Sequence, residues 1–338
     1  MSDHDEINDV SMNGPHVVIL GAGASLAALP NGDKFGKKLP LMNNLVRICG
    51  IEDTLNKYGI KYQGENFEEV FSDLFADNRL ELIREIEATV FLYFGSLELP
   101  DCPTIYDYLV LSLREKDVIA TFNWDPFLWH ALKRNYKWAP MPEALYLHGN
   151  VAIGYCLKDR TIGPRGLNCT KCRNRYNDWK LLYPIKTKNY NKDPFIKESW
   201  DILCKYLEHA YILTIFGYSG PKADVEALQL MKTAWGPSAQ RNLEEVEIID
   251  IKSQDELRIT WDPFIHSHHH MIFSDFRESW MANHPRRTCD ALWAATMQCD
   301  FIDNYPLPFS QDWDQLRQWL APRIQVELRG GNSNLSYQ

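Results

Sequence analysis

Three apolar runs in this chain are each followed directly by small or polar residues. The runs end at Leu20, Ala120 and Leu147, and the segments that follow them are Gly21–Ser25, Thr121–Asp125 and His148–Asn150. Continuous apolar runs are typical of parallel strands that are buried on both faces, and open α/β sheets bind ligands at the carboxyl ends of such strands. We therefore expect the three segments to meet at one crevice, forming a nucleotide site with its own acid–base residue.

The segment Gly21–Ser25 has two interpretations that the residues alone leave open. Glycines let backbone N–H groups approach a pyrophosphate closely, and a helix that begins there adds its positive dipole end. A tight turn between a strand and a helix also favours glycine. Leu26 stands where the dinucleotide-binding fingerprint has its third glycine, and no acidic strand end follows about 20 residues later. An ordinary hydride-transfer dehydrogenase is therefore disfavoured.

The composition narrows the class of protein. The chain has 338 residues, of which 45% are hydrophobic and 24% charged, so it is globular and can bury one large core or two modest ones. Its formal net charge of −9 disfavours general nucleic-acid binding, which needs clustered Lys and Arg. No apolar run approaches the roughly 20 residues that span a bilayer, and the start, Met1–Glu6, is acidic and polar, so we expect a cytoplasmic protein. We expect the eight cysteines to be reduced thiols.

Strand-like and helix-like segments alternate along the chain. Strand candidates are residues 16–20, 117–122, 143–148, 211–216 and 246–251, with helical patterns between them. This alternation predicts an α/β fold, a Rossmann-like doubly wound parallel sheet. We expect a tail at 1–14, one catalytic domain at 15–328 and a flexible tail at 329–338. Within the domain we expect a helical insertion at about 40–115, a small Cys-containing insertion at about 151–195, and an aromatic-rich, mostly helical part at about 261–328.

Four motifs occur in the order and context of sirtuins: Gly21–Ser25, Thr121–Asp125, Leu147–Gly149 and Phe216–Ser219. The chain resembles this family over about residues 15–252, and especially the bacterial sirtuin-like NAD hydrolases of anti-phage defence. The resemblance implies that the first motif cradles the NAD phosphates, that the fourth motif and the strand end at Asp250 lie against the adenosine half, and that Asn123 holds the nicotinamide ribose while His148 acts as catalytic base. The expected NAD-binding residues are Gly21, Ala22, Gly23, Ser25, Asp125, Gly217, Ser219 and Asp250.

The chemistry of glycosidic bond cleavage suits these residue types. Breaking the bond between nicotinamide and ribose forms an oxocarbenium-like sugar as the leaving group departs. The carboxamide of Asn123 can hydrogen-bond the ribose or a water without adding a charge, and neutral His148 can accept a proton near physiological pH. Asp125 could orient its neighbours or face the nicotinamide amide, and it could also cap the helix that begins at Pro126, because these roles are compatible.

The resemblance implies hydrolysis of NAD to nicotinamide and ADP-ribose. Deacetylating sirtuins carry a Phe-Arg-Ser stretch soon after the glycine turn, whereas this chain has Leu29–Gly36 there. They also carry two Cys-x-x-Cys pairs, whereas only Cys169–Cys172 forms such a pair here. NAD-dependent deacylation is the alternative within the family. A non-catalytic module that binds NAD or ADP-ribose and serves oligomerisation is the alternative from another class.

Metal sites are not expected, although zinc stays open. Cys156 precedes the Cys169–Cys172 pair by 13 positions, and Cys204 would lie on a helix, so we assign no residue to a metal. The cluster His266–His270 is interpreted as a polar loop or a partner contact, because adjacent histidines point different ways and no carboxylate motif accompanies them.

The resemblance to defence proteins also implies an activity that is held back until infection. Candidate triggers are self-assembly, a partner ATPase of the HerA translocase type, or an Argonaute-like sensor. We expect a homo-oligomer whose contacts come from the helical insertion and from the C-terminal part, where Trp280, Trp293, Trp313 and Trp319 lie among helical patterns. The alternative is that these rings close the back of the core.

Overall fold

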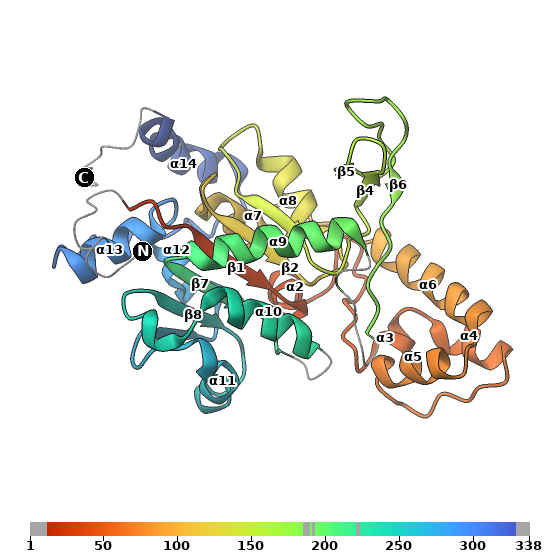
Figure 1. Ribbon diagram of the computed structural model, residues 1–338. Coiled ribbons are helices and arrows are strands. Elements are labelled where there is room, and N and C mark those ends of the chain that lie inside the picture. The colour runs from red at the N-terminus through yellow and green to blue at the C-terminus, as the bar shows by residue number, and fades with distance from the viewer. Residues whose placement is uncertain (1–11, 185–189, 191–192, 221–223, 329–338) are drawn as a thin grey trace.

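The computed structural model describes residues 12–184, 190, 193–220 and 224–328 (Figure 1). Six strands form one parallel sheet in the order β3-β2-β1-β7-β8-β9. Their bounds are β1 His16–Leu20, β2 Val118–Thr121, β3 Glu143–Tyr146, β7 Ile212–Phe216, β8 Glu245–Ile249 and β9 His270–Phe273. The predicted α/β class with a Rossmann-like parallel sheet is confirmed. The expected tails at 1–11 and 329–338 lie outside the described residues.

The sheet is buried at its centre, as its apolar runs predict. Every residue of β1, β2, β7 and β8 is buried, whereas the edge strand β9 is half-buried throughout. Helix α9 (Pro194–His209) packs against β2 and β3, and Figure 1 shows α9 and α10 (Val225–Trp235) lying across the same face of the sheet. Helices α7 (Ile105–Ser112) and α8 (Phe127–Asn135) pack against each other, and α7 also packs on α2 (Ala22–Ala28).

One strand was not anticipated. Residues 261–328 were expected to be mostly helical, yet β9 begins at His270 and pairs with β8 in parallel. The strand is only four residues long and follows a run of histidines, so it lacks the long apolar run that marks the central strands. It reassigns His270 from the expected loop to the sheet edge.

Four helices lie to one side of the sheet in Figure 1: α3 (Leu45–Ile48), α4 (Ile51–Lys57), α5 (Phe67–Ala76) and α6 (Leu80–Gly95). A second small sheet, with the antiparallel order β5-β4-β6, lies within the expected Cys-containing insertion. Its strands are β4 Ile153–Cys156, β5 Thr161–Pro164 and β6 Asn177–Asp178. Both segments leave the parallel sheet between consecutive strands and return to it.

The described elements that follow α10 and lie outside the sheet are η2 Ser238–Gln240, α11 Gln254–Trp261, η3 Asp262–Phe264, η4 Phe276–Glu278, α12 Trp280–Asn283, α13 Thr288–Met297 and α14 Trp313–Leu328. Trp261 and Trp293 are buried, and Trp280, Trp313 and Trp319 are half-buried against the core. None of the helices in the described part of the chain combines the length and apolar character needed to cross a bilayer.

A buried polar chain ties the sheet to α12. The ring of His16 lies 2.6 Å from the Thr214 hydroxyl, which donates to Glu247 at 2.6 Å, and Glu247 also accepts a hydrogen bond from the Trp280 backbone N–H at 2.6 Å. Burial lowers the pKa of His16 to about 3 and raises the pKa of Glu247 to about 7. His16 is therefore neutral near pH 7, whereas Glu247 gains or loses its proton in that range.

Candidate active site

The glycine turn after β1 packs directly against the turn after β7. Gly21 N–H donates to the Phe216 carbonyl at 3.0 Å, and Gly23 N–H donates to the Gly217 carbonyl at 2.9 Å. A Cβ on Gly23 would lie 2.7 Å from Gly217 Cα, and one on Gly21 would overlap the Gly217 carbonyl oxygen. Gly217 has a φ of +61°, which other residues rarely adopt. Close packing of the two turns is by itself a reason for glycine at these positions. A role for Gly21, Ala22 and Gly23 in phosphate binding stays a prediction.

Four polar side chains from α2, α7 and the end of β2 form one buried network. Asn123 Nδ2 donates to the Gly21 carbonyl at 2.9 Å and lies 3.1 Å from Ser25 Oγ and 3.3 Å from the Tyr106 hydroxyl. Ser25 Oγ donates to Asp125 Oδ2 at 2.7 Å and lies 2.7 Å from the Tyr106 hydroxyl. The structure therefore brings together three predicted site residues and adds Tyr106, which sequence reasoning missed.

Counting protons in this network fixes the orientation of Asn123. Ser25 uses its single proton on Asp125, so the Tyr106 hydroxyl must donate to Ser25 Oγ. The two amide protons of Asn123 then serve Gly21 and the pair of hydroxyl oxygens. None of the described residues donates a hydrogen bond to Asn123 Oδ1. This atom is not sealed off from solvent. The amide is held with its carbonyl oxygen open to a ligand.

Asp125 is buried at the base of this network. Burial raises its pKa to about 6, while the hydrogen bond from Ser25 acts in the opposite direction. Its Oδ1 accepts the Phe127 N–H at 3.2 Å, so the carboxylate also caps the start of α8. Asn150 braces the same segment, because its amide donates to the Asp125 carbonyl at 2.7 Å. Asp125 thus has a structural role beside any contact with a ligand.

His148 follows β3 and lies among aromatic rings. Its Nε2 is 3.1 Å from the Tyr190 hydroxyl, with the two rings stacked at 5.7 Å between centroids. The edge of Phe122 meets the His148 ring at 4.9 Å, and Phe122 stacks on Tyr218 at 4.2 Å. His148 is thereby connected through Phe122 to the turn after β7, on the same edge of the sheet as Asn123.

The remaining predicted residues lie at neighbouring strand ends. Ser219 lies in the turn after β7, whose Gly217 N–H donates to the Ile249 carbonyl at 2.9 Å. Asp250 directly follows β8, and its Oδ1 accepts the Lys252 N–H at 3.0 Å. The parallel sheet therefore gathers all the predicted positions at its carboxyl edge. The hydrogen bonds of Asp250 are local, and its contact with a ligand stays a prediction.

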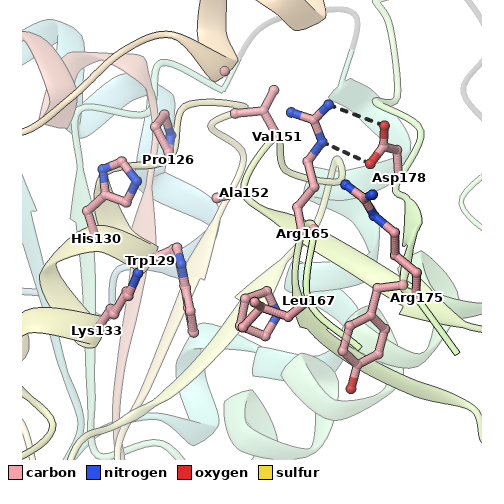
Figure 2. Close-up of a pocket in the computed structure, with 14 residues that line it drawn as sticks. Pro126, Trp129, His130, Lys133, Val151, Ala152, Arg165, Leu167, Arg175 and Asp178 are labelled. Carbon is pink, nitrogen blue, oxygen red and sulfur yellow. Dashed lines mark hydrogen bonds and ion pairs between the residues drawn. The ribbon is translucent and has the colours of Figure 1, made fainter. Parts of the chain in front are cut away.

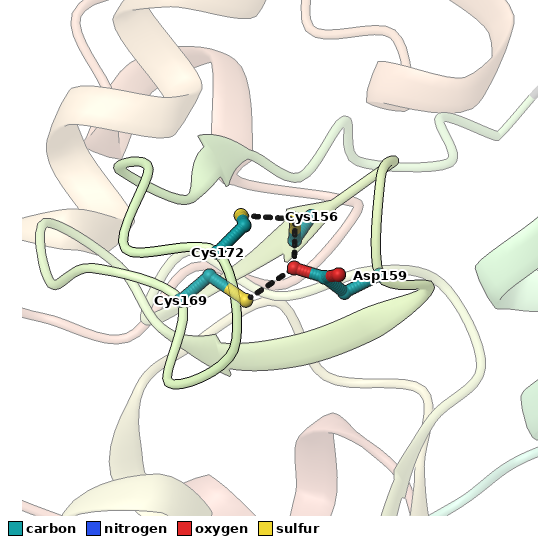
Figure 3. Close-up of side chains that lie close together, drawn as sticks. All are labelled: Cys156, Asp159, Cys169 and Cys172. Carbon is teal, nitrogen blue, oxygen red and sulfur yellow. Dashed lines mark hydrogen bonds between the residues drawn. The ribbon is translucent and has the colours of Figure 1, made fainter.

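A second cluster lies in the small sheet, away from the strand ends. One ligand atom each from Cys156, Asp159, Cys169 and Cys172 lies within 4.8 Å of the others (Figure 3). Asp159 Oδ2 is 3.2 Å from the Cys169 sulfur and 3.6 Å from the Cys156 sulfur, and the Cys156 and Cys172 sulfurs are 3.5 Å apart. Asp159 is thus the partner that the sequence analysis did not find for Cys156, and Cys204 lies on α9 outside this group.

The donor set fits a tetrahedral zinc ion. With Zn–S bonds of about 2.3 Å, neighbouring ligand atoms of a tetrahedron lie about 3.8 Å apart, which agrees with the observed spacing. The Cys172 backbone N–H and the Thr161 hydroxyl lower the pKa of Cys169 to about 7, whereas the hydrogen bond with Asp159 raises the pKa of Cys172 to about 12. A metal ion would favour the thiolate form of both residues. The histidines at 266–270 do not join such a group: His270 accepts from Arg258 at 3.1 Å, and His268 and His269 contact each other.

Comparisons with known proteins add the following. No family model matches the chain, and no curated protein matches it. Among solved structures, a Sir2 homologue in complex with NAD is similar at 12% identity, with a TM-score of 0.41, over 87% of this chain and 95% of that one. A mutant Sir2 homologue in complex with ADP-ribose gives 12% identity and a TM-score of 0.41 over 96% and 99% of the two chains. Sir2 with an inhibitor, 2′-O-acetyl-ADP-ribose and a deacetylated p53 peptide gives 15% identity and a TM-score of 0.38 over 80% and 90%.

Proposed function

We propose that this protein hydrolyses the bond between nicotinamide and ribose in NAD. The observation that carries the proposal is the network of Ser25, Tyr106, Asn123 and Asp125, which holds one uncharged acceptor oxygen open at the carboxyl edge of a parallel sheet. The order of the four sequence motifs that resemble sirtuins supports it further. A merely structural asparagine would have no need of an oriented, unpaired carbonyl oxygen beside a buried carboxyl group.

In this proposal Asn123 and His148 divide the chemistry. Asn123 Oδ1 accepts a hydrogen bond from the attacking water or from a ribose hydroxyl. The bond from the ribose carbon to the nicotinamide nitrogen breaks, an oxocarbenium-like sugar forms, and the water oxygen bonds to that carbon. His148 takes the proton that the water loses, so the products are neutral nicotinamide and ADP-ribose. The Phe122 ring, which stacks on Tyr218, packs against the buried His148.

Deacylation of a lysine side chain is the second candidate. The observation that favours it is the cluster of Cys156, Asp159, Cys169 and Cys172. The chain lacks the second Cys-x-x-Cys pair of deacetylating sirtuins, yet Asp159 completes a four-ligand group without one. The absence of the Phe-Arg-Ser stretch still favours hydrolysis by water. Incubation with NAD, with and without an acetyl-lysine peptide, separates the two. Hydrolysis predicts free ADP-ribose at a rate that the peptide does not change, whereas peptide-dependent turnover with a 2′-O-acetyl product supports deacylation.

We further propose that a zinc ion bound by Cys156, Asp159, Cys169 and Cys172 stabilises the small sheet. The spacing of the four ligand atoms supports this assignment. Because the ion would lie in a closed set of four protein ligands, it would be structural and would take no part in the cleavage of NAD.

The biological setting proposed is bacterial anti-phage defence, in which a cytoplasmic NAD hydrolase depletes NAD and causes abortive infection. Uncontrolled loss of NAD would kill the host cell, so an activating event is needed. A homo-oligomer, a HerA-type ATPase and an Argonaute-like sensor are the proposed means of control. The support for this setting is the motif resemblance alone.

A further inference from the structure

A cavity of about 750 Å³ lies between α8 and the small sheet, outside the candidate active site. Figure 2 shows Trp129, His130 and Lys133 of α8 on one side and Arg165, Leu167 and Arg175 on the other. A volume of this size is within the range of pockets that bind small organic ligands.

The charges that line this cavity oppose the charge of the whole chain. The chain carries a formal charge of −9, yet the lining holds the three cations Lys133, Arg165 and Arg175 with Asp178 as its carboxylate. The Arg165 guanidinium already has partners within the protein, because it pairs with Asp178 at 2.8 Å and lies 4.6 Å from the Phe91 ring centroid. In the described part of the chain, no ion pair or hydrogen bond engages the charged ends of Lys133 and Arg175. Two cations from different elements are thus left to a ligand.

The same cavity offers surfaces for a flat apolar group. Trp129 is half-buried on the α8 side, and Leu167 is 59% exposed on the side of the small sheet. An aromatic side chain beside unpaired cations is the combination that binds nucleotides, since the ring stacks on a base and the cations bind phosphates. Simple anions would use the cations alone.

Both walls are held by well-ordered contacts. The loop that carries Arg175 is closed by hydrogen bonds from Cys169 N–H to the Asn174 carbonyl at 2.7 Å and from Tyr176 N–H to the Leu167 carbonyl at 3.0 Å. Helix α8 begins directly after Asp125 and Pro126. The Asp125 carboxylate accepts the backbone N–H of Phe127, the first residue of the helix. Each wall is therefore held by its own hydrogen bonds before any ligand arrives, which reduces the entropy lost on binding.

We propose that this cavity binds a nucleoside polyphosphate, with its base against Trp129 and its phosphates between Lys133 and Arg175. The binding does not depend on hydrolysis of NAD, so the two proposals can fail separately. His130 adds a neutral ring to the lining, because burial lowers its pKa.

The test is a calorimetric titration of the full-length protein with ATP at low salt. The double variant K133Q/R175Q removes both unpaired cations, which are exposed, so the fold should persist. The control variant K158Q/K171Q also removes two positive charges. Both lysines are exposed, lie in the Cys-containing insertion and do not line the cavity. We expect ATP affinity to fall at least about tenfold in K133Q/R175Q and to stay within about twofold in the control, because only K133Q/R175Q loses charge-assisted hydrogen bonds to the phosphates.

Two further titrants identify the ligand class. Inorganic triphosphate should bind more weakly than ATP, and W129L should reduce that difference, because only ATP has a base that can stack on Trp129. Equal affinity of ATP for the two double variants would overturn the site. Equal binding of ATP and inorganic triphosphate would overturn the role of Trp129. Tighter binding of a single-stranded 20-nucleotide DNA than of ATP would overturn the assignment to a free nucleotide.

Discussion

The substitution Tyr106→Phe tests whether the buried network orients Asn123. It removes a hydroxyl that donates to Ser25 Oγ at 2.7 Å and lies 3.3 Å from Asn123 Nδ2. Asn123 keeps its 2.9 Å bond to the Gly21 carbonyl, so the amide should loosen without leaving its place. We expect kcat for NAD cleavage to fall about tenfold, which corresponds to about 1.4 kcal/mol of lost orientation, with little change in KM. The free energy of unfolding should fall by about 1 kcal/mol, the usual value for one hydrogen bond.

Tyr108→Phe provides the matched control for this experiment. Tyr108 lies on the same helix, is also buried, and donates its hydroxyl to the Ser310 carbonyl at 2.6 Å, outside the network of Ser25, Asn123 and Asp125. The free energy of unfolding of Tyr108→Phe should fall by about 1 kcal/mol, as in Tyr106→Phe, while its rate of NAD cleavage should stay unchanged. Both variants are compared by steady-state release of nicotinamide and by urea denaturation. Equal activity of the two variants at equal stability would refute the inference that Tyr106 positions Asn123.

Three further predictions follow from buried and clustered groups. Burial raises the pKa of Glu247 to about 7 and that of Glu245 to about 8 from 4.5 in the unfolded chain. The folded state thus retains protons that the unfolded state has released, and the free energy of unfolding should fall by about 2–3 kcal/mol between pH 6.5 and 8.5. Urea denaturation at both pH values measures this change in the free energy of unfolding. If Glu247→Gln shows the same pH dependence as the wild type, the assignment to Glu247 is wrong. Elemental analysis should find one zinc per chain, lost in Asp159→Ala and kept in Cys204→Ser; no zinc in the purified wild type would contradict the proposed site. Light scattering at micromolar concentration should give a multiple of the chain mass, whereas a strictly monomeric and fully active protein would contradict the proposed assembly.

The central strands and their polar ends could be predicted from the sequence because long apolar runs report burial on both faces. The edge strand at His270–Phe273 could not, since half-buried residues at a sheet edge need no continuous apolar run.

The parts of the candidate site that were missed depend on contacts between distant segments. Tyr106 joins Ser25 across 81 positions of the chain, and nothing in its own helix distinguishes it from Tyr108. Asp159 did carry a signal, because it follows Cys156 at the spacing that separates Cys169 from Cys172. A search for Cys-x-x-Cys alone overlooks a carboxylate ligand. The glycines at 21 and 23 show the opposite case, in which a clear motif has a packing reason that the sequence does not reveal.

The decisive experiment measures nicotinamide release from NAD by the purified wild-type protein and by two variants. We expect nicotinamide and ADP-ribose in equal amounts from the wild type, and a rate lower by about a hundredfold or more in both Asn123→Ala and His148→Ala, with the fold intact by circular dichroism. Undiminished release by both variants, or NAD that stays intact at micromolar wild-type protein, would contradict it.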